Sequence, residues 1–376
     1  MHCLLDIVLD NAVEEAISGE CTQIEVDLNA DGSVVVTDNG RGIPTDIYLK
    51  TGKVFLESIM TRLWTGGLDP YKHLYKIDGS LRGGGVTIVN ALSEWLEATV
   101  WQEQKQFFQR YERGETVTTL QVTPNRENRW GTSIAFKPDP QILTATRFDS
   151  TLLAVRLHEL AYLNPELQVV LRDRHLERIG RTPHIDTFYY PNGIADYLTG
   201  VNASLTLASD IFHIKTQCDR LQIEVALRWY AASEVKYRHI LHSFSCTAIF
   251  GQAFGERFHP DRELYDALHI TSFANQTRTI HGGTHVEGLK QGAVRAIEAL
   301  HPLSGDDIQE KWRQVRSGLM GILAVMVPHP EYSDSMTYRL ENREVEETIA
   351  AVVEPSLLQY LRDRTEVVDN LLYFCS

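Results

Sequence analysis

The sequence predicts an α+β protein of two domains. Its 376 residues are enough for two separate hydrophobic cores. In the first half, apolar spacings typical of helices and of strands alternate, beginning with one helix and two strands. A second run of such elements begins near residue 188. We therefore expect a first domain over residues 1–186 and a second over residues 187–376.

The first domain is expected to open on a helix over residues 4–17. Gly19 ends this helix, because glycine readily takes the backbone conformation that closes a helix. Two strands over residues 22–28 and 32–38 follow and pair as a hairpin across a turn. The other elements expected here are helices at 54–63, 86–92 and 152–162 and strands at 95–102, 105–114, 118–124, 131–139 and 164–173.

The second domain is expected to contain fewer recognisable elements. Its apolar spacings predict elements at residues 188–198 and 221–230, a helix at 286–300, a strand at 321–330 and a helix at 345–361. Residues 231–271 show no clear period, and we expect them to form an insertion.

Composition favours a cytoplasmic protein. There is no apolar run long enough to cross a membrane, and the start of the chain lacks the basic region of a signal peptide. The five cysteines are scattered without CxxC spacing, which indicates reduced thiols and argues against a zinc site. A net charge of −14 argues against DNA contact over the whole surface and leaves open a local basic patch.

Residues 76–90 read KIDGSLRGGGVTIVN and contain four glycines in seven residues. A glycine-rich turn that opens a helix is the usual geometry for binding phosphate, because free N–H groups and the helix dipole face the anion. The alternative is a plain flexible loop. The stretch lacks the Lys-Ser/Thr of a Walker A loop and does not match GxGxxG, which excludes two common phosphate-binding families.

Two further positions have side chains suited to ligand binding. Asn11 and Glu15 lie four residues apart on one face of the first helix, where an amide can ligate magnesium and a carboxylate can orient water. Asp38 follows a strand and precedes a turn that requires Gly40 and Gly42, so its carboxylate can accept from an exocyclic amine. Taken singly, these are also explained by an exposed polar stripe and by a turn with a capping aspartate.

In this order, four segments resemble the motifs of the GHKL (Bergerat-fold) ATPases, and most closely those of DNA gyrase B and its topoisomerase IV counterpart. These segments are LDNAVEEAISG, VTDNGRGIP, DGSLRGGGVTIVNALSEWLE and GTSIAF. The resemblance continues into the transducer domain of that family through FYYPNGIADYL, IEVALRWY, HGGTHVEGLKQG and VPHPEYSDSMTYRL. It implies a Bergerat-fold α/β sandwich, with a mixed sheet and helices on one face, followed by a ribosomal-protein-S5-like transducer domain.

The resemblance implies a site for ATP and Mg²⁺ in the first domain. Asn11 is similar to the magnesium ligand of the family, and Asp38 to the carboxylate that reads adenine. Thr132 matches the hydroxyl that assists this contact through water, and Arg41 and Pro44 match residues beside the adenine.

The glycine-rich stretch is then identified as the lid over the triphosphate. Tyr75 matches a tyrosine that closes on the nucleotide. The other lid and helix-start positions expected to bind the cofactor are Gly79, Leu81, Arg82, Gly83 and Gly85. Glu15, Gly42 and, in the second domain, Thr337 complete the expected nucleotide-binding set.

The chain departs from the family where the γ-phosphate reacts. The family has a catalytic glutamate four residues before the magnesium asparagine, where this chain has Ile7. Asp6 could replace it only if the helix were bulged by one residue, because five residues correspond to ~140° around a regular helix. The glutamine and lysine of the transducer loop are replaced by Met336 and Tyr338, and the lid histidine by Arg82, which can bind phosphate as a cation.

Two hypotheses about function stay open. The chain starts at the first helix, without the arm that members of the family exchange between protomers, and has no EGDSAG or DxDxD segment of the DNA-cleavage domain. The first hypothesis is a gyrase-B-like protein that binds ATP, pairs as a homodimeric clamp and hydrolyses slowly in DNA topological change. The alternative is a catalytically degenerate paralogue that acts as a non-enzymatic partner of gyrase or topoisomerase subunits. A chaperone-like or signalling GHKL protein fits the transducer segments less well.

Overall fold

The computed structural model describes residues 2–48, 52–62, 85–145, 147–175, 182–201, 209–230, 270–316, 318–333, 337–364 and 367–368. The chain divides into two compact units, Met1–Gly193 and Ile194–Ser376, each described here by itself. The domain boundary at residue 186 stays a prediction, and most of the predicted insertion at 231–271 lies outside the described residues. Among the described helices, none combines the length and apolarity that a membrane span requires.

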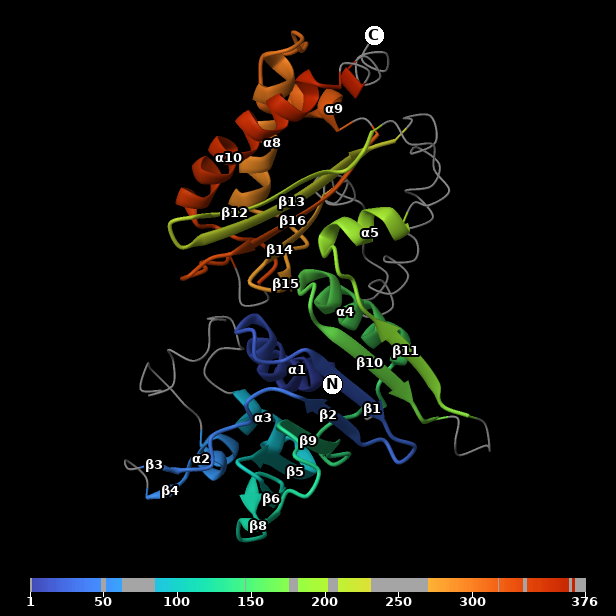
Figure 1. Ribbon diagram of the computed structural model, residues 1–376, viewed down its shortest axis with the longest axis vertical. Helices are drawn as coiled ribbons and strands as arrows, with labels where there is room; N and C mark the ends of the chain where they lie inside the picture. The colour runs from blue at the N-terminus through green and yellow to red at the C-terminus, as the bar shows by residue number, and fades with distance from the viewer. Residues whose placement is uncertain are drawn as a thin grey trace. The chain divides into compact units, whose positions relative to one another are not determined.

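The first unit is built on a nine-stranded mixed sheet (Figure 1). The strand order is β11-β10-β1-β2-β9-β5-β6-β7, and β8 pairs with β6. β1 and β10 run parallel, whereas the other pairs are antiparallel. The strands are β1 Gln23–Leu28, β2 Val34–Asp38, β5 Ser93–Gln102, β6 Lys105–Glu112, β7 Glu115–Thr116, β8 Gln121–Pro124, β9 Gly131–Pro138, β10 Gln168–Asp173 and β11 His184–Phe188. A separate short hairpin consists of β3 Ile47–Tyr48 and β4 Lys53–Val54.

Within the described residues, four helices accompany this sheet: α1 His2–Ile17, α2 Phe55–Thr61, α3 Gly85–Ala91 and α4 Ser150–Leu163. α1 contacts β2 and α3, and α4 contacts β10 and β11. α1 is helical without interruption, and its apolar side chains, among them Leu5 and Leu9, are buried. The helix ends where predicted, because Gly19 adopts a φ of +81° and its N–H binds the Ala16 carbonyl at 2.9 Å.

The second unit contains a five-stranded sheet in the order β12-β13-β16-β14-β15. Its strands are β12 Phe212–Cys218, β13 Leu221–Trp229, β14 Ile270–Ala274, β15 Thr277–Arg278 and β16 Leu319–Met326. Its helices are α5 Ile194–Val201, α8 Thr284–Glu298, α9 Ile308–Val315 and α10 Arg343–Arg362. α8 and α10 lie side by side over the sheet, and their buried faces form one core with β13 and β16 (Figure 1).

The predicted fold class is confirmed, since both units combine a mixed sheet with packed helices. The elements that were not predicted are the short hairpin β3–β4, the strands β7, β11 and β12, the β14–β15 pair and the helix α9. β12 and β11 lie at the ends of their sheets and alternate mainly between exposed and half-buried residues. Their apolar periodicity is therefore weak, and local sequence does not reveal them.

The packing of α8 on α10 predicts a sensitive position at Gly288. A Cβ at this residue would overlap the Glu346 carbonyl oxygen and lie 3.0 Å from the Ile349 Cβ. We expect Gly288→Ala to lower the free energy of unfolding of the second unit by ~1–3 kcal/mol, as overpacking of a core usually does. Chemical denaturation measures this change. The control is Arg295→Ala on the exposed side of the same helix, which should change stability little; equal stabilities of both variants would contradict the packing.

Candidate functional site

The first unit contains a pocket of about 290 Å³ beside the end of β2. α1, the turn after β2, the end of β5 and the start of β9 all contribute to it. Its lining consists of Asn11, Glu15, Arg41, Gly42, Ile43, Pro44, Asp46, Gln102, Glu103, Trp130 and Thr132.

Asp38 lies at the end of β2, next to this lining, and is only 5% exposed. Its Oδ1 accepts hydrogen bonds from the backbone N–H groups of Gly40 at 2.9 Å and Thr132 at 3.2 Å. Burial raises the pKa of the Asp38 carboxyl from 3.8 to about 7, although these two hydrogen bonds favour the ionised form and lower it. The carboxylate is therefore held in place by backbone groups, in surroundings that make its charge costly.

The strand beside Asp38 approaches so closely that one position must be glycine. Gly131 starts β9 with a φ of +121°, and a Cβ there would overlap the carbonyl oxygen of Asp38. This close approach brings the next residue, Thr132, into contact with the pocket. The Thr132 hydroxyl accepts from the Ile43 N–H at 3.1 Å, so the turn after β2 is bound to β9.

Glu15 and Arg41 form a two-pronged ion pair at the pocket wall. The guanidinium of Arg41 donates to both carboxylate oxygens, at 3.0 and 2.8 Å, and its backbone N–H donates to Oε2 at 3.0 Å. The side chain of Gln102 holds the same turn, since Nε2 donates to the carbonyls of Arg41 at 3.0 Å and Gly42 at 2.8 Å. Glu15 therefore orients Arg41 and the turn, in addition to facing the pocket.

The structure brings together six of the residues predicted to bind the cofactor. These six line the pocket: Asn11, Glu15, Arg41, Gly42, Pro44 and Thr132. Asp38 lies directly behind Thr132, and Gly85 begins α3. Thr337 belongs to the second unit, where its φ is +60°. The remaining lid residues Tyr75, Gly79, Leu81, Arg82 and Gly83 lie outside the described residues.

The condition for a catalytic role of Asp6 is not met, because α1 is a regular helix without a bulge. Asp6 instead lies beside Arg156 of α4, with Oδ1 3.9 Å from the guanidinium Nε. Asp10 approaches the same guanidinium at 3.9 Å, and burial raises its pKa to about 6. Ile7, one helical turn before Asn11, is buried.

Sequence reasoning missed five residues of the lining: Ile43, Asp46, Gln102, Glu103 and Trp130. Gln102 and Glu103 lie at the end of β5 and join the site because β5 pairs with β9. Such pairing between distant strands leaves no local signal. Trp130 lies two residues before Thr132, a predicted site residue, and is 53% exposed, which is unusual for a tryptophan. This exposure is known only from the structure, so the sequence alone could not indicate a role for Trp130.

The chemistry of this lining suits a neutral or amine-bearing planar ligand more than a resident metal cluster. Asp38 supplies an acceptor behind Thr132, outside the lining itself, and Pro44 and Ile43 supply apolar surface. Within the described part of the chain, no group of three or more His, Cys, Asp or Glu side chains could hold a metal ion. The side chain of Asn11 offers an amide oxygen for a metal that arrives with a ligand.

Comparisons with known proteins agree with this geometry. Residues 1–128 match the family described as histidine kinase-, DNA gyrase B- and HSP90-like ATPases. Residues 262–376 match the family described as DNA gyrase B.

Curated relatives match along almost the whole chain. The DNA gyrase B protein of Synechocystis is 38% identical, and the match covers 99% of this chain and 32% of the relative. The corresponding gyrase B protein of Thermotoga maritima is 35% identical over 99% of this chain and 54% of its own length. The chain thus spans between a third and about half of the relatives it matches.

A solved structure shows the same fold over the full chain. The 43K ATPase domain of Thermus thermophilus gyrase B, solved in complex with an aminocoumarin, superposes with a TM-score of 0.74 at 28% identity. The match covers 100% of this chain and 89% of that domain.

The raised pKa of Asp38 predicts a pH-dependent stability. The folded-state pKa of about 7 lies above the unfolded value near 3.8. The contribution of the Asp38 carboxyl to the free energy of unfolding is therefore full below pH 4 and is lost as the pH rises through 7. Asp38→Asn removes the titration and keeps the shape. From pH 5 to pH 7, we expect wild type to lose about 2 kcal/mol of unfolding free energy relative to this variant.

Urea denaturation at several pH values measures this difference. The matched control is Glu127→Gln, whose side chain is 77% exposed and whose stability should follow wild type at every pH. If the unfolding free energy of wild type changed with pH in parallel with that of Asp38→Asn, the carboxyl of Asp38 would not be buried.

Proposed function

Because the chain is a gyrase B-like ATPase and transducer region of the type II topoisomerase kind, we propose that its first unit binds ATP in the pocket beside Asp38. The observation that carries this proposal is the buried carboxylate at the end of β2, fixed by the N–H groups of Gly40 and Thr132. The ATPase match at residues 1–128 implies ATP as the nucleotide. The adenine base of ATP would bind in this pocket.

In this proposal Asp38 accepts a hydrogen bond from the 6-amino group of adenine. Both backbone hydrogen bonds that the described residues donate to Asp38 reach Oδ1. Oδ2 is therefore the oxygen proposed to accept from the ligand. Thr132 provides a hydroxyl in the pocket lining, and Pro44 and Ile43 provide apolar surface for the ring. Binding an amine in place of water offsets the cost of burying the charged carboxylate.

We further propose that Asn11 holds Mg²⁺ together with the triphosphate. Magnesium is usually bound through one or two protein ligands plus substrate phosphates, and the amide of Asn11 at the pocket wall fits that pattern. When bound, the ion would neutralise phosphate charge. The glycine-rich residues 79–85 would then contact the phosphates as a lid.

Hydrolysis is proposed to be slow or absent. The residue one turn before Asn11 is the apolar Ile7, which cannot polarise an attacking water. Glu15 is bound to Arg41 through both oxygens, and Asp6 lies beside Arg156. The site is thus built to bind a nucleotide, with the residue that would activate water replaced.

For the whole protein we propose a role in DNA topological change in the cytoplasm, as an ATP-operated clamp that pairs with a second copy. Ile7 favours one alternative, a non-enzymatic partner of gyrase or topoisomerase subunits that uses nucleotide binding alone. DNA contact in either case would need a local basic surface, since the net charge is −14.

Nucleotide binding is tested by the thermal shift of the purified chain with Mg²⁺ and either ATP or a non-hydrolysable analogue. Both should raise the melting temperature, because a ligand that binds only the folded state stabilises it by mass action. Asp38→Ala should remove the shift, and Glu127→Gln should keep it. No shift at millimolar nucleotide in the parent, or an undiminished shift in Asp38→Ala, would contradict the proposal.

Turnover is tested by phosphate release from ATP. The parent should stay well below roughly 1 per second, the lower end of ordinary enzyme rates. Ile7→Glu should raise the rate by at least ~100-fold, since a positioned general base contributes about that much. Ile7→Gln is the matched control without a basic group and should stay at the parental rate.

Asp6→Ala serves as the second control for turnover. Because Asp6 lies beside Arg156, its loss should leave any residual rate unchanged. A parental rate of roughly 1 per second or faster, abolished by Asp6→Ala, would show that Asp6 is the catalytic group and that α1 bulges in the working enzyme.

A further inference from the structure

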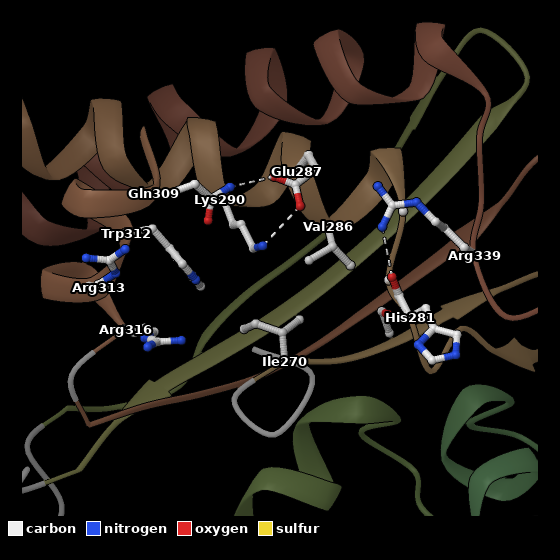
Figure 2. A pocket seen from close by; sticks show the side chains of 13 residues that line it. Ile270, His281, Val286, Glu287, Lys290, Gln309, Trp312, Arg313, Arg316 and Arg339 are labelled. Carbon is white, nitrogen blue, oxygen red and sulfur yellow. Dashed lines mark hydrogen bonds and ion pairs between the residues drawn. The ribbon is translucent and has the colours of Figure 1, made fainter. Parts of the chain in front are cut away.

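The second unit contains a pocket of about 440 Å³ built from its own residues, called here the second-unit pocket. α8, α9 and β14 form its walls (Figure 2). Pockets of roughly 300–1,000 Å³ are the usual size for small-molecule ligands. The volume is therefore sufficient for a compact organic molecule.

Positive charge dominates this lining although the chain as a whole carries −14. Among the lining residues that the structure describes, the cationic side chains are Lys290, Arg313, Arg316 and Arg339, and the one carboxylate is that of Glu287. Lys290 is 5% exposed, and its Nζ lies 3.0 Å from Glu287 Oε1. Glu287 also accepts from Gln309 at 3.3 Å. Glu287 is thus the carboxylate that Lys290 and Gln309 share within the described lining.

The indole N–H of Trp312 is a buried donor without a partner among the described residues. Trp312 is 1% exposed, and its Nε1 makes no hydrogen bond to any residue that the structure describes. Figure 2 shows this nitrogen pointing into the pocket, toward the space between Lys290 and Arg316. Trp229, equally buried, donates instead to the Val315 carbonyl at 3.3 Å. Buried indole N–H groups normally find an acceptor, so the free donor of Trp312 indicates one from a ligand.

The arrangement of these donors fits a phosphate group. The donors come from two helices, α8 and α9, and from the residue that follows α9, and therefore approach from different directions. A tetrahedral phosphate presents acceptor oxygens in several directions, and guanidinium groups bind it in two-pronged fashion. Toward the His281 end, the pocket continues past the apolar side chains of Ile270 and Val286 (Figure 2).

A double helix fits this site poorly. Its phosphates lie on a wide convex surface, which could reach the exposed Arg313 but not the buried N–H of Trp312 inside a concave pocket. A small molecule can enter and satisfy the indole donor. The geometry thus favours a small phosphorylated ligand over a nucleic acid.

We propose that the second-unit pocket binds a small phosphorylated molecule. Its phosphate accepts from the indole N–H of Trp312 and is neutralised by Lys290 and Arg316, and its body lies against Ile270 and Val286. This site is independent of the nucleotide pocket in the first unit and does not rest on the proposed binding of ATP.

The test follows the indole N–H signals of ¹⁵N-labelled full-length protein by NMR during titration with inorganic pyrophosphate. The chain has six tryptophans, and the signal missing from Trp312→Phe identifies Trp312. We expect this signal to move in a saturable way at submillimolar to millimolar pyrophosphate, because its donor gains an acceptor. The signal of Trp229, assigned in the same way, should stay in place because its donor is already bonded.

Affinity variants complete the test. Arg316→Gln should weaken pyrophosphate binding by ~10-fold or more, as loss of a charge-assisted hydrogen bond does. The control is Arg295→Gln, on α8 but outside the lining, which should bind as wild type. Circular dichroism and melting temperature establish that each variant is folded.

Three outcomes would overturn the proposal. The Trp312 signal could stay unmoved up to about 10 mM pyrophosphate, a concentration at which a ligand of millimolar affinity is mostly bound. Arg316→Gln and Arg295→Gln could bind equally well. Short duplex DNA could move the Trp312 signal at lower concentration than pyrophosphate, which would assign the pocket to nucleic acid.

Discussion

The first unit depends on one constraint, the burial of the Asp38 carboxylate at the end of β2. A carboxylate that is only 5% exposed needs hydrogen bonds, and the backbone N–H groups of Gly40 and Thr132 supply them. These bonds fix β2 against the start of β9, exclude a side chain at Gly131 and bring Thr132 to the pocket. The pocket is thus a consequence of how this charge is accommodated.

The helix α1 separates two chemical environments on one element. Asn11 and Glu15 face the pocket, whereas Asp6 and Asp10 face Arg156 of α4. The 3.6-residue period of the helix fixes the side on which each of these residues lies. A carboxylate on the Arg156 side therefore cannot act on a ligand in the pocket while the helix stays regular. In the proposed function, nucleotide binding and hydrolysis therefore depend on different positions of this helix.

Much of this architecture could be predicted from the sequence. α1, β1, β2 and β9 followed from apolar periodicity, because each buries one face, and the site residues on α1 and after β2 followed from local motifs. Gln102 could not be predicted, because it reaches the pocket only through the pairing of β5 with β9. Trp312 could not either, since the second-unit pocket joins α8, α9 and β14 from separate parts of the chain.

The most direct measurement of the central claim compares the affinity of the first unit for ATP with that for the triphosphate of purine riboside, which lacks the 6-amino group. Calorimetry on the full chain should show ATP binding ~10- to 100-fold more tightly, because the analogue leaves a buried carboxylate without its donor. The preference should disappear in Asp38→Ala. Equal affinities of the parent for both nucleotides would contradict the account of Asp38 as the group that selects adenine.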